Sequence, residues 1–261
     1  MSASRALWMR IEPIHALTYF APESRTAFEA AGLRGFWRGY FAGRAAPFGA
    51  AGAGLVTATF YGFHQDFVGR AVPAVWDLAT PAASLAARLE GVDAALDPIA
   101  RGVEIAPALS TLRRVLDGCD PAGRPLYAAN ADLPWPEEPH LALWHACTLL
   151  REHRGDGHVI ALASAGIDGC ESHVLRVLVS GIDPSVIQPH RGWSDDDWDA
   201  ATERLRRRGQ LDAATHATVE AHTDALAVGV DDVSALDPIV DAVVASGAIP
   251  YPNAVGVPPR P

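Results

Sequence analysis

The chain contains 261 residues, of which 49% are hydrophobic and 20% are charged. This composition is typical of a globular protein with a substantial core, and it excludes an intrinsically disordered chain. The 21 basic residues are all arginine and face 31 acidic residues, so that the net charge is −10. Because lysine is missing, Schiff-base chemistry and a Walker-type phosphate loop are also excluded.

The cysteines and the N-terminal segment indicate the compartment. Cys119, Cys147 and Cys170 are an odd number without Cys-x-x-Cys spacing, which argues against a disulfide framework and a zinc ribbon. The N-terminal segment lacks the apolar core of a secretory signal, and no run reaches the roughly 18 to 20 apolar residues of a membrane span. We therefore expect a cytoplasmic protein that does not act at a membrane.

Apolar residues recur at helical spacing along almost the whole chain, whereas alternating strand patterns are nearly absent. The sequence therefore predicts an all-α, mostly helical fold. Thr80 followed by Pro81 is typical of a helix N-cap with proline in the first turn. We interpret residues 1–120 as a helical domain rich in aromatic side chains. Its expected helices cover residues 22–32, 34–44, 65–79 with a kink at Pro73, 80–97 and 106–117.

The proline-rich residues 121–138 indicate a connection to a second half. Asp168 is the expected N-cap of one helix in that half, and Ser194 with Asp197 has the pattern of a capping box. The helices expected there cover residues 139–150, 159–166, 169–181, 195–208 and 216–229. This order of short helices predicts a winged-helix domain over residues 139–247 with a very short wing, followed by an extended tail over residues 248–261.

The segment from Arg151 to His158 carries six ionisable side chains in eight residues, directly after an apolar helix. We expect Gly155 and Gly157 to end that helix, so that Asp156, the N-cap of the next helix, and His158 fold back toward Glu152 and His153. Charges in a buried turn need partners, because burying them alone costs several kcal/mol each. The sequence therefore predicts a functional site here.

Three interpretations of this segment remain open. Glu152, His153, Asp156 and His158 are candidates for acid–base catalysis, because histidine beside a carboxylate is a common proton-transfer pair. The same four side chains offer the nitrogen and oxygen ligands that zinc, iron or manganese accept, although their spacing matches no known metalloprotease signature. They are also suited to a purely structural network that locks the two halves together. The sequence specifies no cofactor.

Other side chains are placed to complete a ligand pocket. His15 and Tyr19, and likewise Tyr40 and Arg44, stand four residues apart on one helix face among many aromatic residues. His145 lies seven residues before Glu152 and therefore shares its face. Arg44, Arg151 and Arg154 are suited to holding an anionic group. We predict that these side chains bind a small molecule: His15, Tyr19, Tyr40, Arg44, His145, Arg151 and Arg154.

The helix expected over residues 195–208 would be the DNA-reading helix of a winged-helix domain. Its first turn, which normally enters the major groove, carries Asp195, Asp196 and Asp197. The helix as a whole holds five acidic residues and four arginines, and residues 210–261 hold seven acidic residues and one arginine. Because phosphate neutralisation supplies most nonspecific affinity for DNA, this charge distribution argues against DNA binding.

The segments 13–23, 36–49, 144–158, 191–209 and 220–227 together resemble a family of actinobacterial hypothetical proteins with a MarR-like helix-turn-helix C-terminal half. The resemblance covers nearly the whole chain and implies a MarR-like winged helix over residues 139–247. MarR-like regulators are dimers with a basic recognition helix and a basic wing, and this acidic chain departs from both. We therefore predict a small-molecule-binding protein, with an enzyme of specialised metabolism as one form of it. The alternatives are a MarR-like, ligand-responsive regulator, which would be a homodimer, and a purely structural or partner-binding domain.

Overall fold

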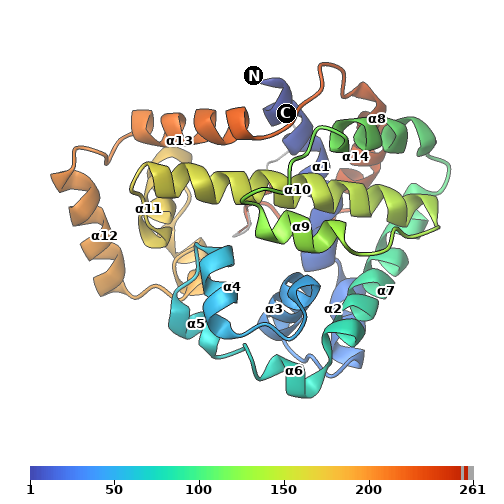
Figure 1. The fold of residues 1–261 in the computed structure, drawn as a ribbon, viewed down its shortest axis with the longest axis horizontal. Coiled ribbons are helices and arrows are strands. Elements are labelled where there is room, and N and C mark those ends of the chain that lie inside the picture. Colours follow the sequence, from blue (N-terminus) through green and yellow to red (C-terminus); the bar gives the residue numbers. More distant parts are fainter. Residues whose placement is uncertain (254–255, 258–261) are drawn as a thin grey trace.

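The computed structural model describes residues 1–253 and 256–257, and all its regular elements are helices (Figure 1). No strand occurs among these residues, which confirms the predicted all-α fold. The α-helices are α1 (Ala3–Phe20), α2 (Pro22–Ala30), α3 (Phe36–Ala45), α4 (Ala53–Phe60), α5 (Gln65–Gly69), α6 (Val75–Leu78), α7 (Pro81–Ala100), α8 (Ala106–Leu116), α9 (Pro125–Ala131), α10 (Pro139–Ser164), α11 (Gly169–Ser180), α12 (Asp195–Arg207), α13 (Ala213–Leu226) and α14 (Asp237–Ala245). Short 3₁₀ helices cover Ala46–Phe48, Pro184–Val186, Pro189–Arg191 and Ser234–Leu236.

Helix α10 is the axis of the molecule. It runs across the middle of the molecule in Figure 1 and contacts α1, α7, α8, α9 and α13. It runs without interruption over 26 residues, so the prediction that Gly155 and Gly157 end the helix is wrong. Each glycine costs a helix about 1 kcal/mol relative to alanine, but packing on several sides of α10 outweighs that cost.

Gly157 is explained by the close approach of an arginine. The Arg124 guanidinium donates hydrogen bonds to the carbonyl of His153 at 2.6 Å and to the carbonyl of Leu226 at 2.5 Å. A Cβ atom at residue 157 would lie 2.7 Å from the Arg124 Nη1 atom. The glycine therefore gives this side chain room to join α10 to the end of α13.

The predicted helix starts are confirmed at three positions. The Thr80 hydroxyl accepts a hydrogen bond of 3.1 Å from the Ala83 amide, and Pro81 is the first residue of α7. Asp168 caps α11, and Ser194 with Asp197 forms a capping box at the start of α12. The single helix expected over residues 65–79 is instead two short helices, α5 and α6, because the chain leaves the helix before Pro73. The proline-rich residues 121–138 contain α9.

Three apolar clusters hold the helices together. One joins α1, α7, α8, the first half of α10 and α14. The second is rich in aromatic side chains and contains residues of every helix from α2 through α7. The third joins the end of α10 to α11, α12 and α13. Helix α14 is late in the chain but packs against α1 and α7. The link from α12 to α13 covers residues 208–212 and contains no strand.

The C-terminal segment returns to the first cluster. Ile249 and Val257 are buried in it, and the Asn253 carbonyl accepts a hydrogen bond of 3.2 Å from Arg176. Part of the tail predicted over residues 248–261, namely 254–255 and 258–261, lies outside the described residues. Within the described ranges, no helix combines the length and the apolar character needed to cross a bilayer.

Candidate ligand-binding site

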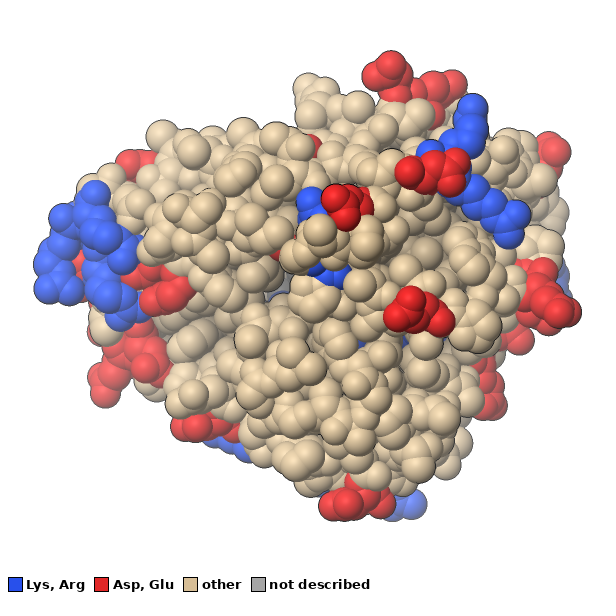
Figure 2. Space-filling view, viewed as in Figure 1, with Lys and Arg blue, Asp and Glu red and all other residues tan. Residues whose placement is uncertain are grey.

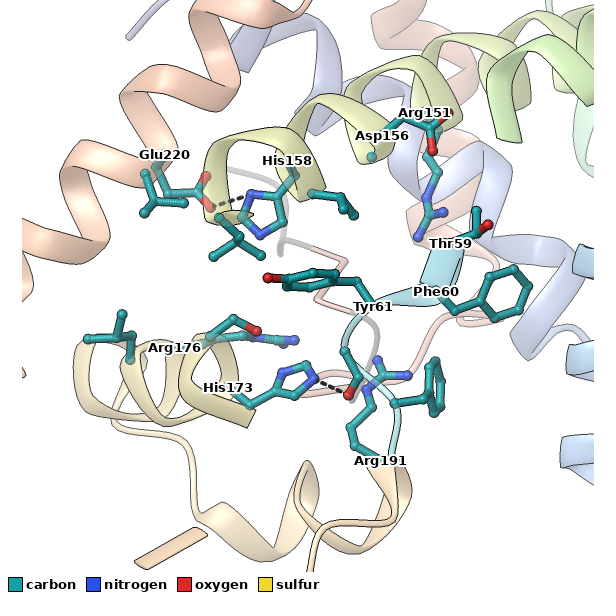
Figure 3. Close-up of a pocket in the computed structure, with 18 of the residues that line it drawn as sticks. Thr59, Phe60, Tyr61, Arg151, Asp156, His158, His173, Arg176, Arg191 and Glu220 are labelled. Carbon is teal, nitrogen blue, oxygen red and sulfur yellow. Dashed lines mark hydrogen bonds and ion pairs between the residues drawn. The ribbon is translucent and has the colours of Figure 1, made fainter. Parts of the chain in front are cut away.

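A cavity of about 220 Å³ lies between α3, α4, α10, α11 and α13. Four arginines from four separate segments line it: Arg44 on α3, Arg151 on α10, Arg176 on α11 and Arg191 in the 3₁₀ helix Pro189–Arg191. Figure 3 shows Arg151, Arg176 and Arg191 around this space, with the Tyr61 ring between His158 and the pair of His173 and Arg176. Phe60, Phe63 and Leu162 are among the apolar residues of its wall.

The two acidic side chains that line the cavity are engaged elsewhere. The Asp156 carboxylate accepts hydrogen bonds from backbone amides of α9, and Glu220 is held by Arg5 and by Arg154 at 3.2 Å. The effect of the arginines is visible at Tyr40. Burial would raise its pKa, but Arg44, Arg191 and Arg151 together hold the pKa below its usual value. The cavity is therefore electropositive inside a protein whose net charge is −10.

Glu152, a predicted site residue, anchors two of these arginines. Its side chain is 2% exposed and accepts hydrogen bonds from Arg44 at 3.1 Å and 3.3 Å and from Arg151 at 2.8 Å. Burial alone would raise the pKa of Glu152, but Arg151 and Arg44 lower it to about 2. The carboxylate therefore stays ionised and fixes α3 against α10, at the edge of the cavity.

Asp156 has a different role from the predicted one. It does not cap a helix that follows it, because α10 does not stop there. Its Oδ2 atom accepts hydrogen bonds from the amides of Leu126 at 3.0 Å and Tyr127 at 2.9 Å, in the first turn of α9. The side chain thus caps a helix from a distant part of the chain. Burial raises the pKa of Asp156 to about 6.

The two histidines of the segment face different neighbours. The His153 ring is 3% exposed, lies edge-on to Tyr127 at 5.1 Å and does not line the cavity. His158 does line it, with its Nδ1 atom 2.9 Å from the Thr223 hydroxyl and 3.7 Å from Glu220. Burial lowers the pKa of each ring to about 4.

The expected convergence of Glu152, His153, Asp156 and His158 is therefore wrong. In a continuous helix successive side chains point about 100° apart, so His153 and His158 point away from the two carboxylates. Glu152 and Asp156 share a face, but one accepts hydrogen bonds from arginines and the other from the amides of α9. Across the described part of the chain, no three His, Cys, Asp or Glu side chains are grouped so that they could hold a metal ion.

The predicted ligand-binding residues divide into two groups. Tyr40, Arg44 and Arg151 line the cavity, and Arg154 lies close by on α10. His15 instead lies in a buried network, with Nδ1 at 3.0 Å from Thr148 and Nε2 at 3.1 Å from the Tyr19 hydroxyl, and this network lines a void of only about 10 Å³. His145 packs edge-on against Trp135 at 4.9 Å. His15, Tyr19 and His145 thus lie outside the cavity.

Residues that the sequence did not single out complete the wall. The Tyr61 hydroxyl donates a hydrogen bond of 2.6 Å to the Ile167 carbonyl, and the Gly62 carbonyl lies 3.0 Å from both His173 Nε2 and Trp193 Nε1. These bonds tie the end of α4 to α11. His173 and Arg176 stand three residues apart and so share a helix face, which was the one local signal for them.

The arginines of α12 are arranged differently. Arg204 and Arg208 donate hydrogen bonds of 2.9 Å and 2.7 Å to Glu171, whose side chain is 1% exposed. Arg206 pairs with Glu203 in the same helix at 2.5 Å. Figure 2 shows these basic side chains gathered at the end of the molecule where α12 lies, directly beside acidic ones. Two of the four arginines of this segment therefore fasten α12 to α11.

Comparison with known proteins places the chain in a family. The chain belongs to a helix-turn-helix family, whose profile matches residues 4–250. The match covers nearly the whole chain, so it includes the cavity as well as the helices α11 to α13. Neither the curated proteins nor the solved structures contain a match.

Proposed function

We propose that this helix-turn-helix family member is a small-molecule-binding protein whose ligand is an organic anion, held in the arginine-lined cavity. The observation that carries the proposal is that Arg44, Arg151, Arg176 and Arg191 line one partly open cavity. Guanidinium groups match carboxylate and phosphate in shape and charge. Cations that lie close together repel one another. An anion that binds between them is stabilised because it relieves this repulsion.

The remaining wall fits the same role. Ligand pockets are mostly apolar, with a few polar groups that fix the orientation of the ligand. Here Phe60, Phe63 and Leu162 would contact the organic part, while the arginines would hold the anionic group. Binding suits this wall better than acid–base catalysis, because a histidine such as His158, with a pKa of about 4, accepts protons poorly at neutral pH.

Titration calorimetry with inorganic phosphate and with benzoate tests this proposal, and benzamide serves as the uncharged match of benzoate. At least one of the two anions should bind, and benzamide should not. Arg176→Gln should weaken that binding about tenfold to a hundredfold, because a hydrogen bond to a charged group contributes about 1.5–3 kcal/mol. Arg207→Gln, at the exposed end of α12, is the matched control and should leave it unchanged. The proposal fails if neither anion binds, or if both variants behave alike.

A ligand-responsive, MarR-like regulator is the second candidate, and membership of the helix-turn-helix family favours it. We infer that DNA binding is nevertheless not the main role of α12, because its first turn carries three aspartates and two of the segment's arginines are engaged with Glu171. Fluorescence polarisation with labelled genomic duplexes at physiological salt, together with native mass spectrometry, separates the candidates. A homodimer that retains specific DNA at this salt concentration would establish the regulator. A protein that binds the anion but no DNA supports the first proposal.

A further inference from the structure

A second chamber of about 320 Å³ adjoins the cavity on the side of α1. Arg5 and Trp8 of α1 and Arg154 of α10 line it, together with Ser180 at the end of α11. Arg154 stacks on the Trp8 ring at 4.6 Å, and Arg5 lies 5.3 Å from the centre of the same ring. Two cations in the wall of the chamber thus contact one aromatic ring, and both also pair with Glu220.

The two chambers share one partition. Six residues line both of them: Arg151, Gly155, His158, Arg176, His216 and Glu220. Side chains form this partition except at Gly155, which has no side chain. Figure 3 shows Arg151, His158, Arg176 and Glu220 around the first chamber. Two of these shared residues are arginines, so an anionic group on either side of the partition meets them.

Gly155 has no packing requirement of the kind that explains Gly157. A Cβ atom at residue 155 would lie 3.6 Å from Glu152 Oε2 and 3.9 Å from Arg151 Nη1, which are ordinary contact distances. An alanine would therefore fit and would favour the helix. Gly155 lines both chambers, so the missing side chain leaves space beside α10 where the two chambers meet. A larger side chain at this position would fill it.

The charges of the second chamber resemble those of the first. Four arginines line it, namely Arg5, Arg151, Arg154 and Arg176, against the carboxylates of Glu12 and Glu220. Arg5 and Arg154 also pair with Asp224 behind the wall, at 3.1 Å and 3.0 Å. Each chamber is thus lined by more arginines than carboxylates.

We propose that the ligand is an elongated molecule with two anionic groups, one held in each chamber, and that it passes the axis of the molecule at Gly155. This inference rests on the proposed function, since it takes the first chamber as an anion site. It adds that a second anionic group, carboxylate or phosphate, distinguishes the ligand from a simple monoanion.

Calorimetry with matched probes tests the second group. Adipate, suberate and azelate are compared with hexanoate, octanoate and nonanoate, and fructose 1,6-bisphosphate is compared with fructose 6-phosphate. The first set reports carboxylate recognition and the second reports phosphate recognition. In at least one matched pair, the doubly anionic probe should bind about tenfold tighter or more, as one additional charge-assisted hydrogen bond provides.

Two variants test whether the affinity advantage of the doubly anionic probe depends on the second chamber. Gly155→Leu should remove it, whereas Gly54→Leu, a helical glycine with open space around it, should retain it. Ser180→Glu places a carboxylate at the second chamber and should weaken only the doubly anionic probe. Ser180→Gln, of the same size, should not.

The outcomes separate this inference from the proposed function. If singly and doubly anionic probes bind equally, or if the advantage persists in both Gly155→Leu and Ser180→Glu, the two-group ligand is wrong while the anion site remains. If no anionic probe binds, both proposals fail. Melting temperatures of the variants show that a loss of binding is not a loss of folding.

Discussion

The arginines around the cavity and the arginines at the end of α12 differ chiefly in their surroundings. The side chains of Arg44 and Arg151 are 11% and 14% exposed, whereas that of Arg206 is 61% exposed. Charges in a partly desolvated space interact strongly, while charges in water are screened. In the conspicuous run from Arg206 to Arg208, Arg206 is therefore solvated and Arg208 fastens α12 to α11, whereas the arginines that form a site come from distant parts of the sequence.

The ion pairs of the two regions should respond very differently to mutation. Glu152→Ala removes the buried carboxylate between Arg44 and Arg151 and should lower the free energy of unfolding by about 3–5 kcal/mol, because it leaves buried charge without its partner. Glu203→Ala removes the exposed partner of Arg206 and should cost about 0–1 kcal/mol. Urea unfolding of both variants measures the difference. Equal effects would contradict the contrast between the two regions.

Stability should fall on acidification from about pH 6.5 to pH 4, by about 2–4 kcal/mol in total. Burial lowers the pKa of His145 and of His153 to about 4, with Arg88 and Arg124 respectively as the second cause. Since the unfolded chain binds protons more readily in this range, the stabilisation is complete above pH 6.5 and is lost as the pH falls. Asp156, whose pKa is raised, opposes the change but is a single group. Urea unfolding across this range measures the slope.

The control for this prediction is a variant with both His145→Gln and His153→Gln. It should show a flatter dependence of stability on pH, because two of the groups that titrate differently in the two states are gone, while others such as His158 remain. A wild-type protein that is equally stable at pH 4 and pH 6.5 would contradict the assignment of these rings as buried and neutral.

The smallest of the three effects concerns the cap that Asp156 gives to α9. Asp156→Ala leaves the amides of Leu126 and Tyr127 without their acceptor and should cost about 1–3 kcal/mol. Asp156→Asn retains an oxygen acceptor and removes the buried charge, so it should cost less than the alanine variant. Thermal unfolding at neutral pH compares them, and an alanine variant as stable as the asparagine variant would show that the cap contributes nothing.

The sequence predicted what depends on neighbouring residues. Thr80, Asp168 and Ser194 were identified as helix caps because a cap acts within one turn of its own residue. The continuity of α10 was not predictable in this way. The low helix propensity of Gly155 and Gly157 favours a break in the helix. Only the tertiary contacts of α10, such as the contact with Arg124, override this preference.

The cavity was predictable only in part, for the same reason. The structure does place Arg44, Arg151 and Glu152 together, as expected of charges that need partners when buried. Arg176 and Arg191 join them through the packing of α11 and of the 3₁₀ helix Pro189–Arg191. The spacing of His173 and Arg176 indicates a shared helix face, but it does not indicate which elements pack against that face. His15 and His145 were plausible ligand contacts by type and spacing, but apolar packing placed them in the core.

Anomalous diffraction from crystals grown with selenate, a tetrahedral oxyanion, tests the central claim most directly, because it shows which arginines hold an anion. The cavity should contain an ordered selenate in contact with at least two of Arg44, Arg151, Arg176 and Arg191. Selenate bound only beside Arg206 and Arg207, with none among the cavity arginines, would contradict the account.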